Sequence, residues 1–141
     1  MNRGPVLRVW LPLLLASVAL GFAFALLPGP RDILRWAGLV LAIAGLSGVI
    51  VARYTLGRSF SILPKATALV TRGIYAHIRN PIYVFGMVFT VGLLLMLRKS
   101  YLWFVLPIFA GLQIVRARKE ARVLEARFGD AYREYRARTW F

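Results

Sequence analysis

Long uncharged runs alternate with short basic stretches along this chain. The runs cover residues 9–27, 36–52, 81–97 and 100–115. A helix needs about 20 predominantly apolar residues to cross a bilayer, within a range of roughly 17–25. The pattern therefore predicts an all-α, polytopic membrane protein with about four membrane helices.

The interpretation of the second run, and of the closely spaced third and fourth runs, depends on the residues that flank them. The second run reaches full length if Ile33 and Leu34 join it and if the Arg35 side chain extends to the interface. Only Arg98 and Lys99 separate the third run from the fourth. These last two runs predict a tight helical hairpin, which either spans the bilayer or is re-entrant.

The first run also has some features of a cleaved signal peptide. Arg3 and Arg8 give it a basic start, and Ala23-Phe24-Ala25 is similar to a cleavage site. However, the apolar stretch is longer than a typical signal-peptide core, and three more apolar runs follow it. A retained membrane helix is the better interpretation.

The distribution of basic residues predicts an orientation. Of the 19 lysines and arginines, 15 lie before the first run, between the second and third, or after the fourth. The positive-inside rule places these segments and both termini in the cytoplasm. The net charge of +14 then reflects topology and contact with anionic lipid. Nucleic acid is not an expected partner, because the charges lie between apolar runs and not on one soluble face.

Composition narrows the class of protein further. Hydrophobic residues make up 60% of the 141 residues and charged residues 17%, which argues against a soluble globule. The absence of cysteine excludes disulfides, thiolate metal sites and cysteine nucleophiles. In the second run Gly38, Ala42 and Gly45 share one helical face, where small residues let another membrane helix approach closely.

The segment RGIYAHIRNPIY, residues 72–83, is polar and stiff at the entrance to the third run. Asn80 is a favoured N-cap and Pro81 a favoured first helical residue, so the segment could simply begin a helix, with Tyr75 and Tyr83 at the interface. The same geometry also forms a binding site, because a helix N-terminus offers free N–H groups and partial positive charge to an anion. A site at this boundary suits one water-soluble and one lipid-soluble reactant.

The basic tail after the fourth run is predicted to continue as a helix. Arg116 and Glu120 are four residues apart and share a face. They form either a weak surface ion pair or, because Arg116 directly follows the last apolar residue, a functional pair. Gly129 is expected to end this helix, and Asp130 to cap a short cytoplasmic C-terminal helix.

Two segments, LVTRGIYAHIRNPIYVFG and RARKEARVLEARFGDAYREY, together resemble the membrane-bound isoprenylcysteine carboxyl methyltransferases and the related phospholipid methyltransferases. The resemblance covers roughly residues 55–138. It implies one methyltransferase domain over residues 1–141, with two membrane helices in 1–54 and a cofactor-binding core in 55–141. It also implies S-adenosylmethionine as cofactor, a lipophilic or lipidated acceptor and no metal. The chain has no GxGxxG motif, so the soluble Rossmann-type methyltransferases do not compete.

The resemblance implies a particular set of site residues. The cofactor would contact residues before and at the start of the third run and one residue of the tail: Leu69, Val70, Tyr75, Asn80, Pro81, Tyr83 and Glu120. Arg116 matches an arginine that the family places beside the acceptor. The sequence departs from the isoprenylcysteine enzymes at Asn80, where they carry histidine, and at Ala121, where they carry a second glutamate.

The candidate acceptors differ in what they require. A carboxylate is deprotonated at neutral pH and needs only a cation to hold it, which an arginine does bidentately. Arg116 therefore favours an anionic acceptor, or a lipid phosphate near the reacting group. Together with this, the resemblance implies carboxyl O-methylation of the isoprenylcysteine type. The alternatives are N-methylation of a phospholipid amine, an NADPH-dependent reduction of a membrane lipid on a similar scaffold, and a non-catalytic membrane protein.

Overall fold

The computed structural model describes residues 4–57 and 69–141, and these residues are mostly helical. The helices are α1 (Gly4–Leu26), α2 (Ile33–Leu56), α3 (Pro81–Leu97), α4 (Val105–Phe128) and α5 (Asp130–Arg138). Two 3-10 segments, η2 (Gly73–Ala76) and η3 (Ser100–Phe104), precede α3 and α4. The described residues contain no β-strand, only an isolated bridge between Ile78 and Trp140. The all-α prediction is confirmed.

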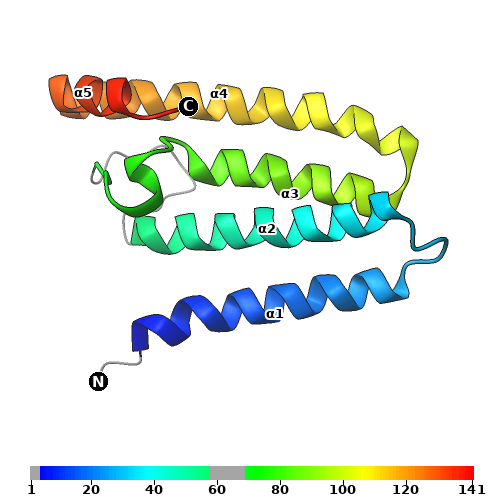
Figure 1. Cartoon of the computed structure of the whole chain (residues 1–141). Helices are drawn as coiled ribbons and strands as arrows, with labels where there is room; N and C mark the ends of the chain where they lie inside the picture. The colour runs from blue at the N-terminus through cyan, green and yellow to red at the C-terminus, as the bar shows by residue number, and fades with distance from the viewer. Residues whose placement is uncertain (1–3, 58–68) are drawn as a thin grey trace.

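Helices α1 to α4 run side by side in alternating directions (Figure 1). Within residues 4–57 and 69–141, three stretches are long and apolar enough to cross a membrane, namely Val9–Leu26, Ile33–Leu56 and Ser100–Phe128. Helix α3 is apolar but shorter, with 17 residues. Arg98 ends α3 in the left-handed conformation with φ of 56°, and the chain then turns back into α4. The last two runs thus form the predicted hairpin.

Helices α2 and α3 touch through their backbones. A Cβ atom added at Gly38 would lie 2.5 Å from the backbone nitrogen of Met96, which is a steric clash. One added at Gly92 would clash with the backbone of Ala42. Gly45 meets the backbone of Phe89 in the same way. The predicted small-residue face of α2 is therefore confirmed, and its partner is α3.

One end of the bundle carries both short turns, and Asp32 connects them. Its carboxylate caps α2 by accepting from the backbone N–H of Arg35 at 3.0 Å, and it pairs with Arg98 at 3.0 Å. The Arg35 side chain reaches the loop between α1 and α2, where its guanidinium donates a hydrogen bond to the carbonyl of Pro28 at 2.7 Å. Only 5% of the surface of Arg35 is exposed. The guanidinium is thus buried beneath the loop.

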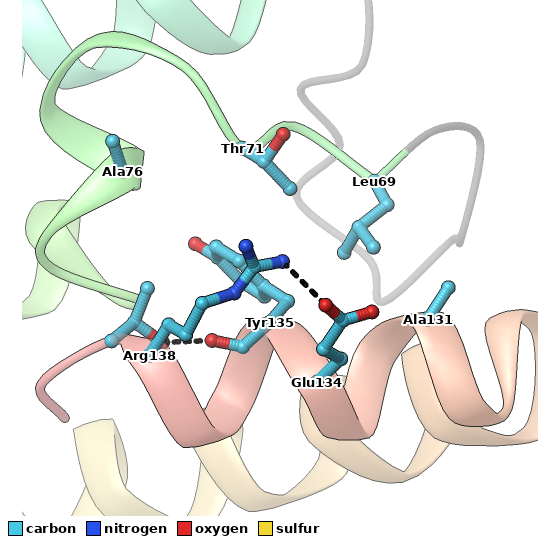
Figure 2. Close-up of a pocket in the computed structure, with 8 residues that line it drawn as sticks. Leu69, Thr71, Ala76, Ala131, Glu134, Tyr135 and Arg138 are labelled. Carbon is cyan, nitrogen blue, oxygen red and sulfur yellow. Dashed lines mark hydrogen bonds and ion pairs between the residues drawn. The ribbon is translucent and has the colours of Figure 1, made fainter.

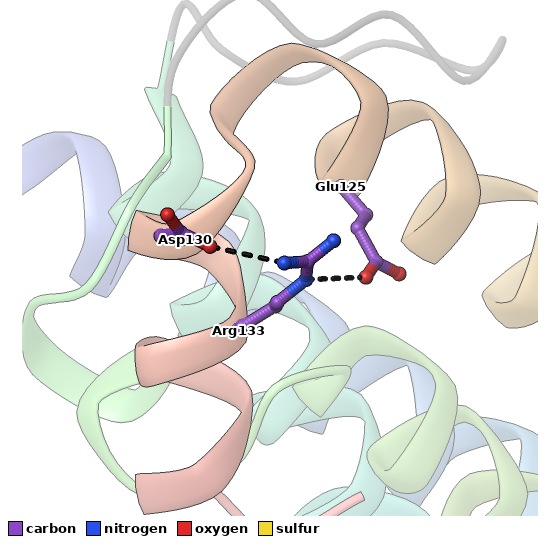
Figure 3. A network of polar contacts seen from close by, with 3 residues as sticks. All are labelled: Glu125, Asp130 and Arg133. Carbon is purple, nitrogen blue, oxygen red and sulfur yellow. Dashed lines mark hydrogen bonds and ion pairs between the residues drawn. The ribbon is translucent and has the colours of Figure 1, made fainter.

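At the other end the chain reverses after α4. Gly129, with φ of 50°, ends α4 and occupies the N-cap position of α5. The prediction that Asp130 caps α5 is wrong, because its carboxylate instead pairs with Arg133 at 3.0 Å. Arg133 also pairs with Glu125 at 3.0 Å, and this network spans the reversal (Figure 3). Helix α5 buries Tyr132 and Tyr135 on its inner face.

The two ends of the bundle separate the segments as the charge distribution requires. The turns at 27–32 and 98–99 lie at one end, and the start of α1, residues 69–80 and α5 lie at the other (Figure 1). We propose that the second end is cytoplasmic.

The chain has no cysteine, so a single introduced cysteine reports the orientation of its segment directly. Lys99→Cys should react with a membrane-impermeant maleimide in intact cells, and Arg136→Cys only after permeabilisation. The opposite labelling would overturn the assignment.

The close approach of α2 and α3 predicts a strong effect at Gly92. Gly92→Ala should destabilise the bundle by about 1–3 kcal/mol, because the new methyl group collides with helix backbone and not with a movable side chain. Gly111→Ala is the matched control, since a Cβ there meets nothing within 4 Å. Thermal unfolding in detergent, followed by circular dichroism, measures both. Equal midpoints for the two variants would contradict the packing described here.

Candidate functional site

A hydrogen bond joins the first turn of α3 to the charged half of α4. The Tyr83 hydroxyl donates to Oε2 of Glu120 at 3.1 Å, in a partly buried position. Arg116 lies one turn earlier on α4 and is exposed. No ion pair joins Arg116 to Glu120 in the part of the chain that the structure describes. The interpretation of these two residues as a surface ion pair is therefore wrong, because Glu120 turns toward α3.

Three buried tyrosines from two elements lie within electrostatic reach of this carboxylate. Tyr75 of η2 is 7% exposed, and Tyr132 and Tyr135 of α5 are 1% and 5% exposed. The Tyr135 hydroxyl donates to the backbone carbonyl of Tyr75 at 2.7 Å. This bond fastens α5 to the segment that leads into α3. The aromatic rings of Tyr132 and Tyr135 lie 6.3 Å apart, in a tilted arrangement.

The environment keeps these hydroxyl groups protonated. Burial raises the pKa of Tyr75 well above its usual value of 10, and the negative charge of Glu120 raises it further. Burial raises the pKa of Tyr135 to about 12, although the positive charge of Arg79 opposes this effect. Both tyrosines are therefore neutral near pH 7. The Tyr135 hydroxyl acts as a hydrogen-bond donor, both residues offer aromatic surfaces, and neither acts as a base.

Residues 140–141 bind the backbone at the start of α3. The N–H of Arg79 donates to the carbonyl of Trp140 at 2.9 Å, and that of Trp140 donates to the carbonyl of His77 at 2.8 Å. Asn80 donates to the carbonyl of Phe141 twice, from its backbone N–H and from its side-chain amide, each at 3.0 Å. An extended segment therefore lies across the entrance to the helix.

This contact corrects one expectation about the helix start. Asn80 occupies the N-cap position, but its side chain makes no capping hydrogen bond, because its amide group binds Phe141. The N–H groups of Arg79 and Asn80, which come just before the helix, are taken by the carbonyls of residues 140–141. Pro81 does begin α3 as predicted, and it is fully buried.

A pocket of about 410 Å³ opens between the segment before α3 and helix α5 (Figure 2). Its lining combines apolar, hydroxyl and charged side chains: Leu69, Thr71, Ala76, Ala131, Glu134, Tyr135, Arg138 and Thr139. Glu134 and Arg138 form an exposed ion pair of 3.3 Å. Tyr135 connects this pocket to the tyrosine cluster, since its hydroxyl reaches Tyr75.

A second pocket, of about 360 Å³, lies between α3 and α4. Apart from Gln113 and the Tyr83 hydroxyl, its lining is apolar: Tyr83, Val84, Met87, Val88, Ala110, Gln113, Ile114, Trp140 and Phe141. Tyr83 belongs both to this pocket and to the hydrogen bond with Glu120. The apolar pocket therefore meets the polar cluster, which comprises Glu120, Tyr75, Tyr132 and Tyr135, at the side chain of Tyr83.

The structure brings several of the predicted site residues together. Tyr83 and Glu120 are in contact, and Tyr75 lies within the electrostatic influence of Glu120. Leu69 lines the pocket beside α5, and Val70 follows it as a half-buried residue. Sequence reasoning missed Tyr132, Tyr135, Trp140 and Phe141. The spacing of three between the two tyrosines was an available signal, because it places both on one face of a helix.

These features define a helical membrane protein with a polar site at one end of its bundle, next to an apolar pocket between two membrane helices. Residues 33–131, more than half of the chain, match the model of the phospholipid methyltransferase family, and the chain belongs to that family. It is accordingly a membrane methyltransferase with a lipid substrate. Neither a curated protein nor a solved structure matches the chain.

Proposed function

We propose that this protein transfers a methyl group from S-adenosylmethionine to a lipophilic acceptor at the cytoplasmic face of the membrane. The observation that carries the proposal is the state of Glu120. Its carboxylate is half-buried and accepts a hydrogen bond from Tyr83, yet it has no cationic partner among the described residues. A buried carboxylate without a counter-charge is unfavourable, and the cationic end of S-adenosylmethionine would supply one.

The residues around Glu120 fit the other parts of this cofactor. The faces of Tyr75 and Tyr83 offer cation–π contact to a sulfonium, worth about 0.5–2 kcal/mol. Leu69 and Val70 border the pocket beside α5, whose volume of about 410 Å³ lies within the usual range for small-molecule sites. We assign the nucleoside part to this pocket. Asn80 and Pro81 act indirectly, because they fix where α3 begins and therefore where Tyr83 lies.

The chemistry asks little of the protein beyond position and exclusion of water. S-adenosylmethionine, when bound, supplies an already activated methyl group for an in-line displacement. Glu120, Tyr75 and Tyr83 bind and orient the cofactor. The buried side chains of Tyr75, Tyr132 and Tyr135 exclude water from the site. A misplacement of about 1 Å can cost about 100-fold in rate, so a rigid start to α3 matters for activity.

The assignment of Glu120 is tested against a second glutamate on the same helix. Glu120→Ala should weaken binding of S-adenosylmethionine by about 2–5 kcal/mol, or roughly 30-fold or more, because a buried charged partner is lost. Glu125→Ala is the control, since Glu125 pairs with Arg133 near the surface and away from Tyr83. Calorimetric titration of detergent-purified protein measures both. Equal affinities in the two variants would show that the cofactor site lies elsewhere.

For the acceptor we propose a carboxylate of the isoprenylcysteine type, held by Arg116. This arginine is exposed at the point where α4 passes from apolar to charged residues. Its positive charge lies within electrostatic reach of the Tyr83 hydroxyl. A phospholipid amine is the second candidate, favoured by the family description and by the negative charge of Glu120. Membership of a methyltransferase family argues against the NADPH-dependent reductase.

The two acceptors are distinguished by direct assay of methyl transfer. N-acetyl-S-farnesylcysteine and phosphatidylethanolamine vesicles are each supplied with radiolabelled S-adenosylmethionine. Arg116→Gln should reduce carboxyl methylation at least about tenfold, through loss of a charge-assisted hydrogen bond. Arg118→Gln, an exposed neighbour on α4, should leave it unchanged. Methylation of phosphatidylethanolamine alone would replace the carboxylate proposal with the amine.

A further inference from the structure

The side chain of Gln113 is a polar group in the apolar first half of α4. It is the only hydrogen-bonding side chain between residues 105 and 115. Polar side chains within membrane helices are unfavourable in hydrocarbon, so they usually serve either packing between helices or function. The surroundings of this amide decide between the two roles.

The amide of Gln113 faces α3 and not the surrounding lipid. Its Nε2 lies 3.2 Å from the point where a Cβ of Gly86 would stand, so it lies against space that the glycine leaves open. Gln113 is half-buried, whereas its neighbours Leu112 and Ile114 are 59% and 41% exposed. The side chain therefore points into the gap between the two helices.

Within residues 4–57 and 69–141, the Gln113 side chain forms no hydrogen bond. The polar groups beside it are already engaged. The carbonyl of Gly86 accepts from the Thr90 hydroxyl at 2.9 Å, and the Tyr83 hydroxyl donates to Glu120 at 3.1 Å. Neither polar atom of the amide is sealed inside the protein without a partner. The packing of α3 on α4 thus leaves its hydrogen-bonding capacity unused and accessible.

Gln113 also lies close to the proposed point of methyl transfer. Gln113 and Tyr83 line the same apolar pocket between α3 and α4. Along α4, Gln113 precedes Arg116 by three residues and Glu120 by seven. At a rise of about 1.5 Å per residue, these separations are roughly 5 and 10 Å toward the middle of the membrane. An acceptor whose reacting group lies beside Arg116 therefore brings its next atoms, on the side of its hydrocarbon chain, level with Gln113.

We propose that Gln113 donates a hydrogen bond to a carbonyl oxygen of the acceptor lipid, and thereby selects acceptors that carry a carbonyl close to the reacting group. The inference rests on the proposed function for the place of that group. The Gln113 amide is the side-chain donor left for such an oxygen, because the other polar side-chain group of the pocket lining, the Tyr83 hydroxyl, is bonded to Glu120. A carbonyl that entered this pocket without a donor would lose its hydration uncompensated.

Two classes of acceptor carry a carbonyl in the required place. An N-acylated prenylcysteine has an amide beside its carboxylate, and a diacyl phospholipid has ester carbonyls between its headgroup and its hydrocarbon chains. Each class has a matched analogue that lacks the carbonyl. These analogues are S-farnesylthiopropionic acid for N-acetyl-S-farnesylcysteine, and dialkyl for diacyl phosphatidylethanolamine. The two pairs of probes therefore test the same hydrogen bond and distinguish its sources.

The first experiment measures binding of the probes without S-adenosylmethionine. Detergent-purified protein is titrated with each probe, and the bound probe is quantified by native mass spectrometry. In at least one pair the carbonyl-bearing probe should bind about threefold to tenfold tighter, the usual effect of one neutral hydrogen bond. Gln113→Met, which approximates the shape of the side chain and removes the donor, should abolish this preference. Gln113→Leu repeats the test if Gln113→Met fails to fold.

Thr90→Val is the matched control for this experiment. The Thr90 hydroxyl is also a polar group of the helix pair, but it is already bonded to its own helix. Thr90→Val should therefore leave the preference unchanged. Equal binding of both members of each pair by the parent protein, or a preference that survives Gln113→Met, would overturn the inference.

The second experiment separates selection of the acceptor from a structural role. In the methyl-transfer assay, Gln113→Met should raise KM for the preferred carbonyl-bearing acceptor about threefold to tenfold and leave kcat unchanged. The carbonyl-free analogue should be methylated as in the parent protein. Equal losses on both members of the pair would mean that Gln113 only supports the bundle, and the inference would fall.

The binding experiment keeps this inference separate from the proposed function. If Gln113→Met abolishes the preference for a carbonyl while S-adenosylmethionine fails to bind, the role of Gln113 stands and the methyl donor assignment falls. If Glu120→Ala weakens binding of S-adenosylmethionine as expected but Gln113→Met leaves the preference intact, the proposed function stands and the role of Gln113 falls.

Discussion

The contact between the backbones of α2 and α3 is the constraint on which the rest of the structure depends. Gly38 and Gly45 on one helix and Gly92 on the other leave no room for a side chain between them. Helices in hydrocarbon gain little from burying apolar surface, so close van der Waals contact has to hold them together. This contact fixes the position of α3 along the axis of α2, and therefore the position of Pro81 and Tyr83 along that axis.

Tyr83 transmits that position to the site. Its ring lines the apolar pocket, and its hydroxyl meets Glu120 on α4. The residues that separate a lipid environment from a charged one are usually spread over many positions, but here one side chain faces both. A change in how α3 packs on α2 would therefore move the polar cluster and the apolar pocket together. The protein can keep its site rigid without any covalent crosslink, since the chain has no cysteine.

Sequence reasoning recovers those features that depend on local pattern. The apolar runs gave the membrane helices, the spacing of Gly38, Ala42 and Gly45 gave the packing face, and Asn80-Pro81 gave the start of α3. It could not recover contacts between distant segments, which depend on how the whole chain folds back. The amide of Asn80 reaches Phe141, 61 residues away, although its residue type favours a local cap. Glu120 is similar, because its helical spacing suggests Arg116 as partner and the tertiary structure supplies Tyr83.

The same distant contact gives the molecule an order of assembly. Helices α1 to α3 can pack as soon as they enter the membrane, because the contacts between them involve nothing that follows. The amides at the start of α3 find their partners only after residue 141 has been translated. At about 5–20 residues per second the ribosome needs roughly 3–12 s to cover that distance. During this interval the nascent chain is an inserted bundle in which the start of α3 still lacks these partners, so membrane insertion precedes completion of this end of the bundle.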